Sequence, residues 1–185
     1  MSEILIVAAT EPELCGHPGL VCGVGPVEAA AATTQALAVR RVAAVLHVGI
    51  AGARRDSRIA VGSVVVGAEA FYEDLTTTRR LAPDRARASS ALVSAVCGVL
   101  GVEPIVIGTS GRVGGTNACP VEAMEGFAVL RAAELAGVPA VEVRAVSNLV
   151  EDARADWRID EALAALAQAL PGLVASITAA VSPSP

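Results

Sequence analysis

Residues 20–52, LVCGVGPVEAAAATTQALAVRRVAAVLHVGIAG, decide the fold of this chain. A short apolar run at 20–24 leads into an alanine-rich segment of helical length at 26–40, and a second apolar run follows at 43–48. Strand-length runs that alternate with helix-length segments are typical of a sheet that helices cover on both faces. Pro26 suits a first helical turn, because the N–H that proline lacks would have no partner there. The stretch therefore predicts a strand, a helix and a second strand.

The same alternation continues along the chain and predicts a single α/β domain over residues 1–181. A chain of 185 residues, 54% of them hydrophobic, is long enough to bury one large core. We expect a three-layer α/β/α architecture with a central mixed sheet, and a disordered tail at 182–185. Expected strands are 4–9, 20–24, 43–48, 63–68, 104–109 and 140–147. Expected helices are 26–40, 83–100, 120–136, 159–170 and 173–181.

Composition excludes several functions. All 14 basic residues are arginine, so the chain has no lysine for a Schiff base or a P-loop. A net charge of -5 and arginines that never form a run longer than a pair argue against nucleic-acid binding. The four cysteines form no C-x-x-C pair and are accompanied by only two histidines, so we expect buried thiols in a reducing cytoplasm and no metal site. No organic cofactor is expected either.

Two apolar segments raise the question of a membrane. Residues 4–9 are too short for a signal sequence and follow Glu3, where a basic flank would be needed. Residues 161–181 approach the roughly 20 residues that span a bilayer. Pro171 and Gly172 interrupt this segment and Gln168 lies within it. The pattern favours two core helices over a membrane span.

The stretches after the first two expected strands lie at the sheet edge where α/β proteins place their ligands. Glu11 and Glu13 come after the first strand and are candidates for acid–base chemistry; alternatively, they only stabilise a helix N-terminus. The second strand ends in Gly23-Val24-Gly25-Pro26. This is a weak dinucleotide signal, because Glu28 replaces the third glycine and would repel a phosphate.

Three further stretches carry candidate site residues. His47-Val48-Gly49-Ile50-Ala51-Gly52 ends the third strand, and its histidine is interpreted as a core residue. Val121-Glu122-Ala123-Met124-Glu125-Gly126 is expected to start a helix, with Glu125 at the edge of the apolar face. Val143-Arg144-Ala145-Val146-Ser147-Asn148 is expected to be a strand with a polar tip, whose arginine could instead pair with Glu142.

The combination of Met-Glu-Gly at 124–126 with Arg-x-x-Ser-Asn at 144–148 resembles the purine nucleoside phosphorylase and nucleosidase superfamily and, within it, the futalosine hydrolases. The glycine loop at 49–52 is similar to the Gly-x-Ala-Gly loop of that superfamily. The resemblance extends from residue 4 to about residue 170. It implies a nucleoside phosphorylase-like fold, a small-molecule purine nucleoside as the ligand, and assembly as a homo-oligomer.

The resemblance also implies roles for individual residues. Glu13 would activate the water that attacks the sugar, and Arg144 would steady that water. Glu125 would accept hydrogen bonds from the 2′- and 3′-hydroxyls, a hold that tightens as positive charge develops on the ribose. Met124 would pack against the ribose. Gly49 would lie in the loop that passes close to the sugar.

Asn148 stands where adenine-specific nucleosidases of this superfamily carry an aspartate. An amide can donate to a 6-oxo group or to N7 of a purine but cannot protonate it, so the expected substrate is a 6-oxopurine nucleoside. The position of His47 is one at which phosphorylases commonly place a phosphate-binding arginine, so hydrolysis is favoured over phosphorolysis. The resemblance therefore implies an N-ribosyl hydrolase that cleaves futalosine to hypoxanthine, a step of menaquinone biosynthesis.

Alternative functions remain open on the sequence. They are a purine nucleoside phosphorylase, a methylthioadenosine/S-adenosylhomocysteine nucleosidase and a non-catalytic purine-nucleoside-binding protein. Relatives stack the base on a phenylalanine that the matching stretch of this chain lacks. Phe127, Phe71 and Tyr72 are the candidate substitutes, from the same subunit or a neighbouring one, and the sequence does not choose among them. Futalosine carries a benzoate-containing arm beyond its 5′ carbon, for which Arg112 or Arg54 is the candidate cation.

Overall fold

The computed structural model describes residues 3–75, 81–116 and 118–182, and its centre is an eight-stranded mixed sheet. The strands are β1 (Glu3–Ala8), β2 (Leu20–Val21), β3 (Val42–Ala53), β4 (Val64–Tyr72), β5 (Arg85–Arg87), β6 (Ile105–Thr109), β7 (Val121–Ala123) and β8 (Ala140–Leu149). The α-helices are α1 (Pro26–Val39), α2 (Ser90–Leu100), α3 (Gly126–Leu135) and α4 (Ile159–Val181). Short 3-10 helices lie at η1 (Glu11–Leu14), η2 (Arg55–Ser57) and η3 (Arg154–Asp156).

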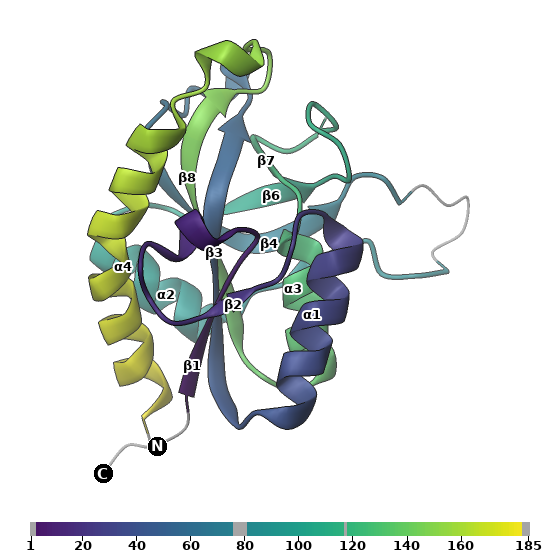
Figure 1. Cartoon of the computed structure of the whole chain (residues 1–185), viewed down its shortest axis with the longest axis vertical. Coiled ribbons are helices and arrows are strands. Elements are labelled where there is room, and N and C mark those ends of the chain that lie inside the picture. Colours follow the sequence, from purple (N-terminus) through teal and green to yellow (C-terminus); the bar gives the residue numbers. More distant parts are fainter. Residues whose placement is uncertain (1–2, 76–80, 117, 183–185) are drawn as a thin grey trace.

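Five strands of the sheet pair in a closed ring. β3 pairs in parallel with β1 and β8 and antiparallel with β7. β8 also pairs antiparallel with β4, β4 pairs with β6, and β6 returns to β7. β3 is mostly apolar, and both β3 and β8 are almost wholly buried, as expected of central strands covered on both faces. They run side by side to the same end of the molecule (Figure 1).

Helices cover both faces of this sheet and confirm the predicted three-layer fold (Figure 1). α2 and α4 pack on one face, against alternate residues of β3 and β8 such as Leu46 and Val143. α1 and α3 pack on the other face, against residues such as Val45. The alternation of side chains along β3 thus supplies both cores. The ring formed by β3, β8, β4, β6 and β7 was not predicted.

The expected helix 120–136 is wrong in its first turns. Residues 121–123 form β7, which pairs with β6 and β3, and α3 begins only at Gly126. The Glu122 carboxylate accepts the backbone N–H groups of Gly114 and Thr116, each at 2.6 Å. These pairings between distant segments override the local helical pattern. A similar error affects residues 83–100, where β5 forms against β4 and α2 starts at Ser90.

The two C-terminal helices expected at 159–170 and 173–181 are one continuous helix, α4, with Pro171 inside it. Its buried residues keep helical spacing across the proline: Ala162, Leu166, Leu170, Leu173 and Ile177. By length and composition α4 could cross a membrane. Its buried face packs against α2, β3 and β8. Apart from Ser182, the expected tail lies outside the described residues.

Candidate active site

A cavity of about 530 Å³ opens where β1, β3, β7 and β8 end, next to the start of α4. It lies at the sheet edge that the sequence predicted. The lining residues are Ala9, Thr10, Pro12, Glu13, Val24, Ile50, Ala51, Gly52, Val113, Glu122, Ala123, Met124, Glu125, Ser147, Asn148, Arg154, Trp157, Ile159, Asp160 and Leu163. Glu13, Met124, Glu125 and Asn148, four of the predicted site residues, therefore share one cavity.

The Glu13 carboxylate is held in place by three hydrogen bonds. Its Oε2 accepts the backbone N–H of Thr10 at 2.9 Å and the Thr10 hydroxyl at 2.8 Å. Its Oε1 accepts the backbone N–H of Ile50, at 2.9 Å, and thus links the end of β1 to β3. Glu13 is buried and lines the cavity, whereas Glu11 is exposed and does not line it. Of the two acids, Glu13 is the one in a position to do chemistry.

Arg144 is fully buried among carboxylates. Its Nε donates to Oε1 of Glu142 at 2.9 Å, and its Nη2 lies 3.5 Å from Oε2 of Glu125. Burial alone would lower the pKa of Arg144, but Glu142, Glu125 and Glu13 raise it above its ordinary value. Arg144 Nη1 is buried without a hydrogen-bond partner among the described protein groups. Arg144 therefore forms the salt bridge considered as an alternative and still keeps one donor free for the site.

Gly49 lies directly beneath this pair of charged groups. A Cβ at residue 49 would come within 2.3 Å of Nη1 of Arg144 and 2.6 Å of Oε1 of Glu13. The two polar atoms therefore flank the same point above Gly49. Gly49 itself does not line the cavity, and its lack of a side chain leaves room for Glu13 and Arg144.

His47 is fully buried, as predicted for a core residue, and it contacts Arg144. Its Nδ1 lies 3.0 Å from the Val7 carbonyl oxygen, and its Nε2 contacts Nη2 of Arg144. Burial and the neighbouring guanidinium hold the pKa of His47 well below its usual 6.5. The ring is therefore neutral, with Nδ1–H donating to Val7 and Nε2 accepting from Arg144. A neutral ring that is already engaged on both sides is not a phosphate ligand.

Glu125 and Met124 lie in the turn between β7 and α3. Oε1 of Glu125 accepts the backbone N–H of Gly25 at 3.0 Å, and its Oε2 faces Arg144. Gly25 has a φ of 93°, a conformation that favours glycine, at the start of α1. Glu125 is only 4% exposed but still lines the cavity, beside Met124. It is therefore not the ordinary surface glutamate that the sequence left as an alternative.

Asn148 reaches the cavity because β8 is irregular at its end. Ala51 and Gly52 of β3 pair with Val146 and Asn148, so Ser147 is an extra residue in β8. Neighbouring side chains of a regular strand point to opposite faces, and this bulge lets Ser147 and Asn148 both line the cavity. The Ser147 hydroxyl donates to Oδ1 of Asn148 at 2.8 Å, and Nδ2 of Asn148 donates to the Leu149 carbonyl at 2.8 Å.

Phe127 does not join these residues, because within one chain it does not line this cavity. Its ring stacks on Tyr72, with centroids 5.1 Å apart, in a separate groove beside α1. The backbone N–H of Phe127, at the start of α3, donates to the Thr109 hydroxyl at 2.8 Å. Any contact of Phe127 with a substrate would require a second copy of the chain.

The candidate cations Arg54 and Arg112 do not line the cavity either. Arg54 forms an exposed ion pair with Asp56. Arg154 and Trp157 are present instead, with the guanidinium carbon 4.0 Å from the centre of the indole ring. No local signal in the sequence distinguishes among its arginines, because the choice depends on how the connection from β8 to α4 folds back.

Sequence reasoning also missed Thr10 and Glu122. Thr10 stands three residues before Glu13, the spacing of a capping box, and this signal could have identified it. Glu122 lines the cavity while it anchors the loop at 114–116. The sequence predicts a helix over this stretch, so it gives no indication that Glu122 lines the cavity.

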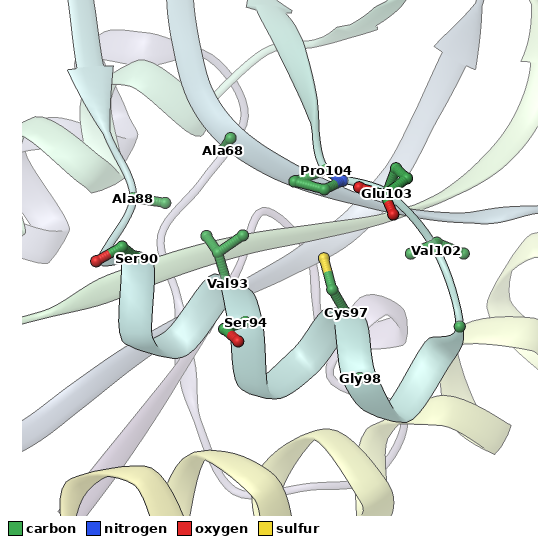
Figure 2. Close-up of a pocket in the computed structure, with 11 residues that line it drawn as sticks. Ala68, Ala88, Ser90, Val93, Ser94, Cys97, Gly98, Val102, Glu103 and Pro104 are labelled. Atoms are coloured by element: carbon green, nitrogen blue, oxygen red, sulfur yellow. The ribbon is translucent and has the colours of Figure 1, made fainter.

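A second hollow, of about 630 Å³, lies beside α2 (Figure 2). It is larger, but its walls are mostly small or apolar side chains. The polar side chains among its lining residues are Ser90, Ser94, Cys97 and Glu103 (Figure 2). A single carboxylate with no guanidinium or amide beside it cannot provide the chemistry of the first cavity, so the first cavity is the candidate active site.

Comparisons with known proteins identify the family of this chain. The sequence matches the Phosphorylase superfamily over residues 14–182. Futalosine hydrolase from Streptomyces coelicolor is 36% identical, over 82% of this chain and 75% of the relative. The solved S-adenosylhomocysteine nucleosidase of Streptococcus pyogenes, in complex with 5-methylthiotubericidin, has a TM-score of 0.80 at 25% identity, over 92% of this chain and 95% of that chain.

The fold is shared with a further solved structure, futalosine hydrolase of Helicobacter pylori. Its TM-score is 0.82 at 16% identity, and the match covers 94% of this chain and 97% of that chain. The resemblance seen in the sequence is thus confirmed along nearly the whole chain. This protein is a member of the phosphorylase superfamily.

Proposed function

We propose that this protein is an N-ribosyl hydrolase that cleaves the glycosidic bond of a 6-oxopurine nucleoside, releasing hypoxanthine from futalosine. The observation that carries the proposal is the juxtaposition of Oε1 of Glu13 and Nη1 of Arg144 above Gly49. It combines a fixed base, at the wall of a cavity that also holds Glu125 and Asn148, with a fixed donor that is fully buried and does not itself line the cavity.

The attacking water is placed between Glu13 and Arg144. Oε1 of Glu13 accepts one hydrogen bond, from Ile50, and so retains a lone pair for a proton of the water. Nη1 of Arg144 donates to the water oxygen and orients the other lone pair towards the anomeric carbon. As the water attacks, its proton passes to Glu13 and the bond between the sugar and the purine nitrogen breaks. General-base catalysis of this kind contributes about 10²–10⁴-fold in rate.

Glu125 stabilises the sugar as it becomes cationic. Its carboxylate is already held by Gly25 and Arg144, so little reorganisation is needed when it accepts the 2′- and 3′-hydroxyls. Those hydroxyls become better donors as an oxocarbenium-like charge develops, and the hydrogen bonds then strengthen. Met124 packs on the ribose and helps to exclude water.

Asn148 selects the leaving base. The amide is oriented by Ser147 and Leu149, and it meets a keto oxygen or N7 as a donor. An adenine, which leaves more readily when it is protonated, would find no acid at this position. This argues for hypoxanthine and against the methylthioadenosine nucleosidase alternative.

Phosphorolysis is disfavoured by the charges around the nucleophile. Glu13, Glu125 and Glu142 surround Arg144, the one guanidinium among them, and His47 is neutral. A phosphate dianion would have to approach two carboxylates of this cluster at the cavity wall. A neutral water has no such penalty.

The cellular setting follows from the same assignment. The product without its hypoxanthine would continue in menaquinone biosynthesis, and the enzyme would work in the cytoplasm. We further propose a homo-oligomer, because the groove of Tyr72 and Phe127 beside α1 includes the exposed side chain of Val27. No metal or organic cofactor takes part in the steps above.

The test is chromatography of free purine from futalosine, inosine and methylthioadenosine, each with and without phosphate. We expect hypoxanthine from futalosine at a rate that phosphate does not change. Release that requires phosphate would identify a phosphorylase, and preferential release of adenine would identify the sister nucleosidase. Hypoxanthine binding in calorimetry without release of base from any nucleoside would identify a binding protein.

A further inference from the structure

The cavity contains a group of residues that the sugar and base contacts leave unused. They come from η3 and the start of α4: Arg154, Trp157, Ile159, Asp160 and Leu163. Three of the five are apolar or aromatic, and Arg154 brings a positive charge. With Glu125 assigned to the hydroxyls and Asn148 to the base, this wall is left to the substituent on the 5′ side of the nucleoside.

Arg154 and Trp157 form a stacked pair at this wall. The guanidinium carbon of Arg154 lies 4.0 Å from the centre of the indole ring, within the range of a cation–π contact. Stacking pre-orients the planar fork of the guanidinium and leaves its N–H groups available to a bidentate anion. No ion pair of Arg154 is found among the described residues, whereas Arg158 pairs with Glu161.

The indole N–H adds a second polar feature. Nε1 of Trp157 is buried and has no hydrogen-bond partner among the described protein groups. A buried donor without an acceptor is costly, so a ligand oxygen that reached it would be favoured. Asp160 also lines this wall, but it belongs to the first turn of α4, where the helix dipole offsets its charge.

We propose that Arg154 and Trp157 determine substrate specificity by binding a carboxylate carried on an apolar or aromatic 5′ arm. The apolar side chains of Ile159 and Leu163 pack on the arm, the indole ring covers it, and the guanidinium pairs with the carboxylate. This inference rests on the proposed function, since it uses the same cavity and the same reaction. It replaces Arg54 and Arg112 as candidates for that contact.

The kinetic test compares futalosine, which has such an arm, with inosine, which has none. In Arg154→Gln we expect KM for futalosine to rise about 10-fold with kcat unchanged, and KM for inosine to stay as in the wild type. Arg158→Gln is the matched control, because Arg158 is a neighbouring exposed arginine outside the cavity. An equal effect of Arg154→Gln on both nucleosides, or no effect on either, would overturn the proposal.

A binding measurement separates this inference from the proposed reaction. Trp157 is the only tryptophan, so its emission reports on this wall even if the wild type cleaves neither nucleoside. We expect futalosine to bind at least about 10-fold more tightly than inosine in a fluorescence titration, and Arg154→Gln to lose that preference. Release of no base together with this preference would refute the reaction and keep the inference. Equal affinities for the two nucleosides would refute the inference, whatever the rate of cleavage.

Discussion

Substitution of Gly49 by alanine should disturb the proposed catalytic geometry strongly while it lowers the stability of the fold only slightly. The added Cβ would lie 2.3 Å from Nη1 of Arg144 and 2.6 Å from Oε1 of Glu13, and contacts below 3.0 Å essentially never occur. Both polar atoms must therefore retreat by several tenths of an ångström. They are the ends of side chains and can move, so the cost to folding stays near the lower end of the ~1–3 kcal/mol typical of overpacking.

The same displacement acts directly on the proposed water site. A misplacement of about 1 Å in a reacting geometry can cost about 100-fold in rate, so we expect kcat of Gly49→Ala to fall about 10- to 100-fold. The assay is hypoxanthine release from futalosine, with thermal unfolding measured in parallel. The melting temperature should fall by only about 2–4 °C per kcal/mol.

A matched control is Gly98→Ala in α2. A Cβ at residue 98 would meet nothing within 4 Å, and alanine favours the helix by about 0.5–1 kcal/mol. This variant should keep its kcat and unfold at the wild-type temperature or slightly above it. A folded Gly49→Ala protein with wild-type kcat would refute the placement of water between Glu13 and Arg144.

Three other substitutions test separate parts of the structure. Glu13→Gln should lower kcat about 10²–10⁴-fold while hypoxanthine binding in calorimetry is retained, because the amide cannot take a proton; unchanged turnover would remove Glu13 from its role. The pKa of His47 lies well below 6.5 in the folded state, so the unfolded state binds more protons than the folded state below about pH 6.5. The free energy of unfolding therefore decreases as the pH falls below that value. In His47→Asn the decline in unfolding free energy from pH 6.5 to 5 should be shallower than in the wild type, and an equally steep decline would contradict the neutral ring. Pro171→Ala should raise the melting temperature, because it restores a main-chain donor inside α4 and removes the ~3 kcal/mol penalty of proline in a helix. The opposing term is smaller: proline stabilises the folded state by ~0.4–1 kcal/mol because it restricts the unfolded chain. A lower melting temperature would show that Pro171 is needed for packing.

Much of the fold could be predicted because its signals are local. The apolar runs that became β1, β3 and β8 and the alanine-rich segment of α1 stand out in the sequence, and the layered arrangement follows from their alternation. The closure of the sheet could not be predicted in this way. β7 has only three residues, and it is a strand because β6 and β3 lie on either side of it.

The site residues also fall into those that the sequence could identify and those that it could not. Glu13, Glu125 and Asn148 could be named because the stretches that carry them resemble motifs of the superfamily. The role of Gly49 depends on where two side chains from other elements meet, and that meeting has no local signal. The same holds for Arg154, which is one of several arginines until η3 places it over Trp157.

The most direct test concerns the amide that meets the purine. It compares kcat/KM for futalosine with kcat/KM for the same nucleoside bearing adenine in place of hypoxanthine, in the wild type and in Asn148→Asp. We predict that the wild type prefers the hypoxanthine compound by at least about 10-fold and that the aspartate variant shifts the ratio towards adenine. A wild-type preference for adenine, or a ratio that the substitution leaves unchanged, would contradict the assignment of Asn148.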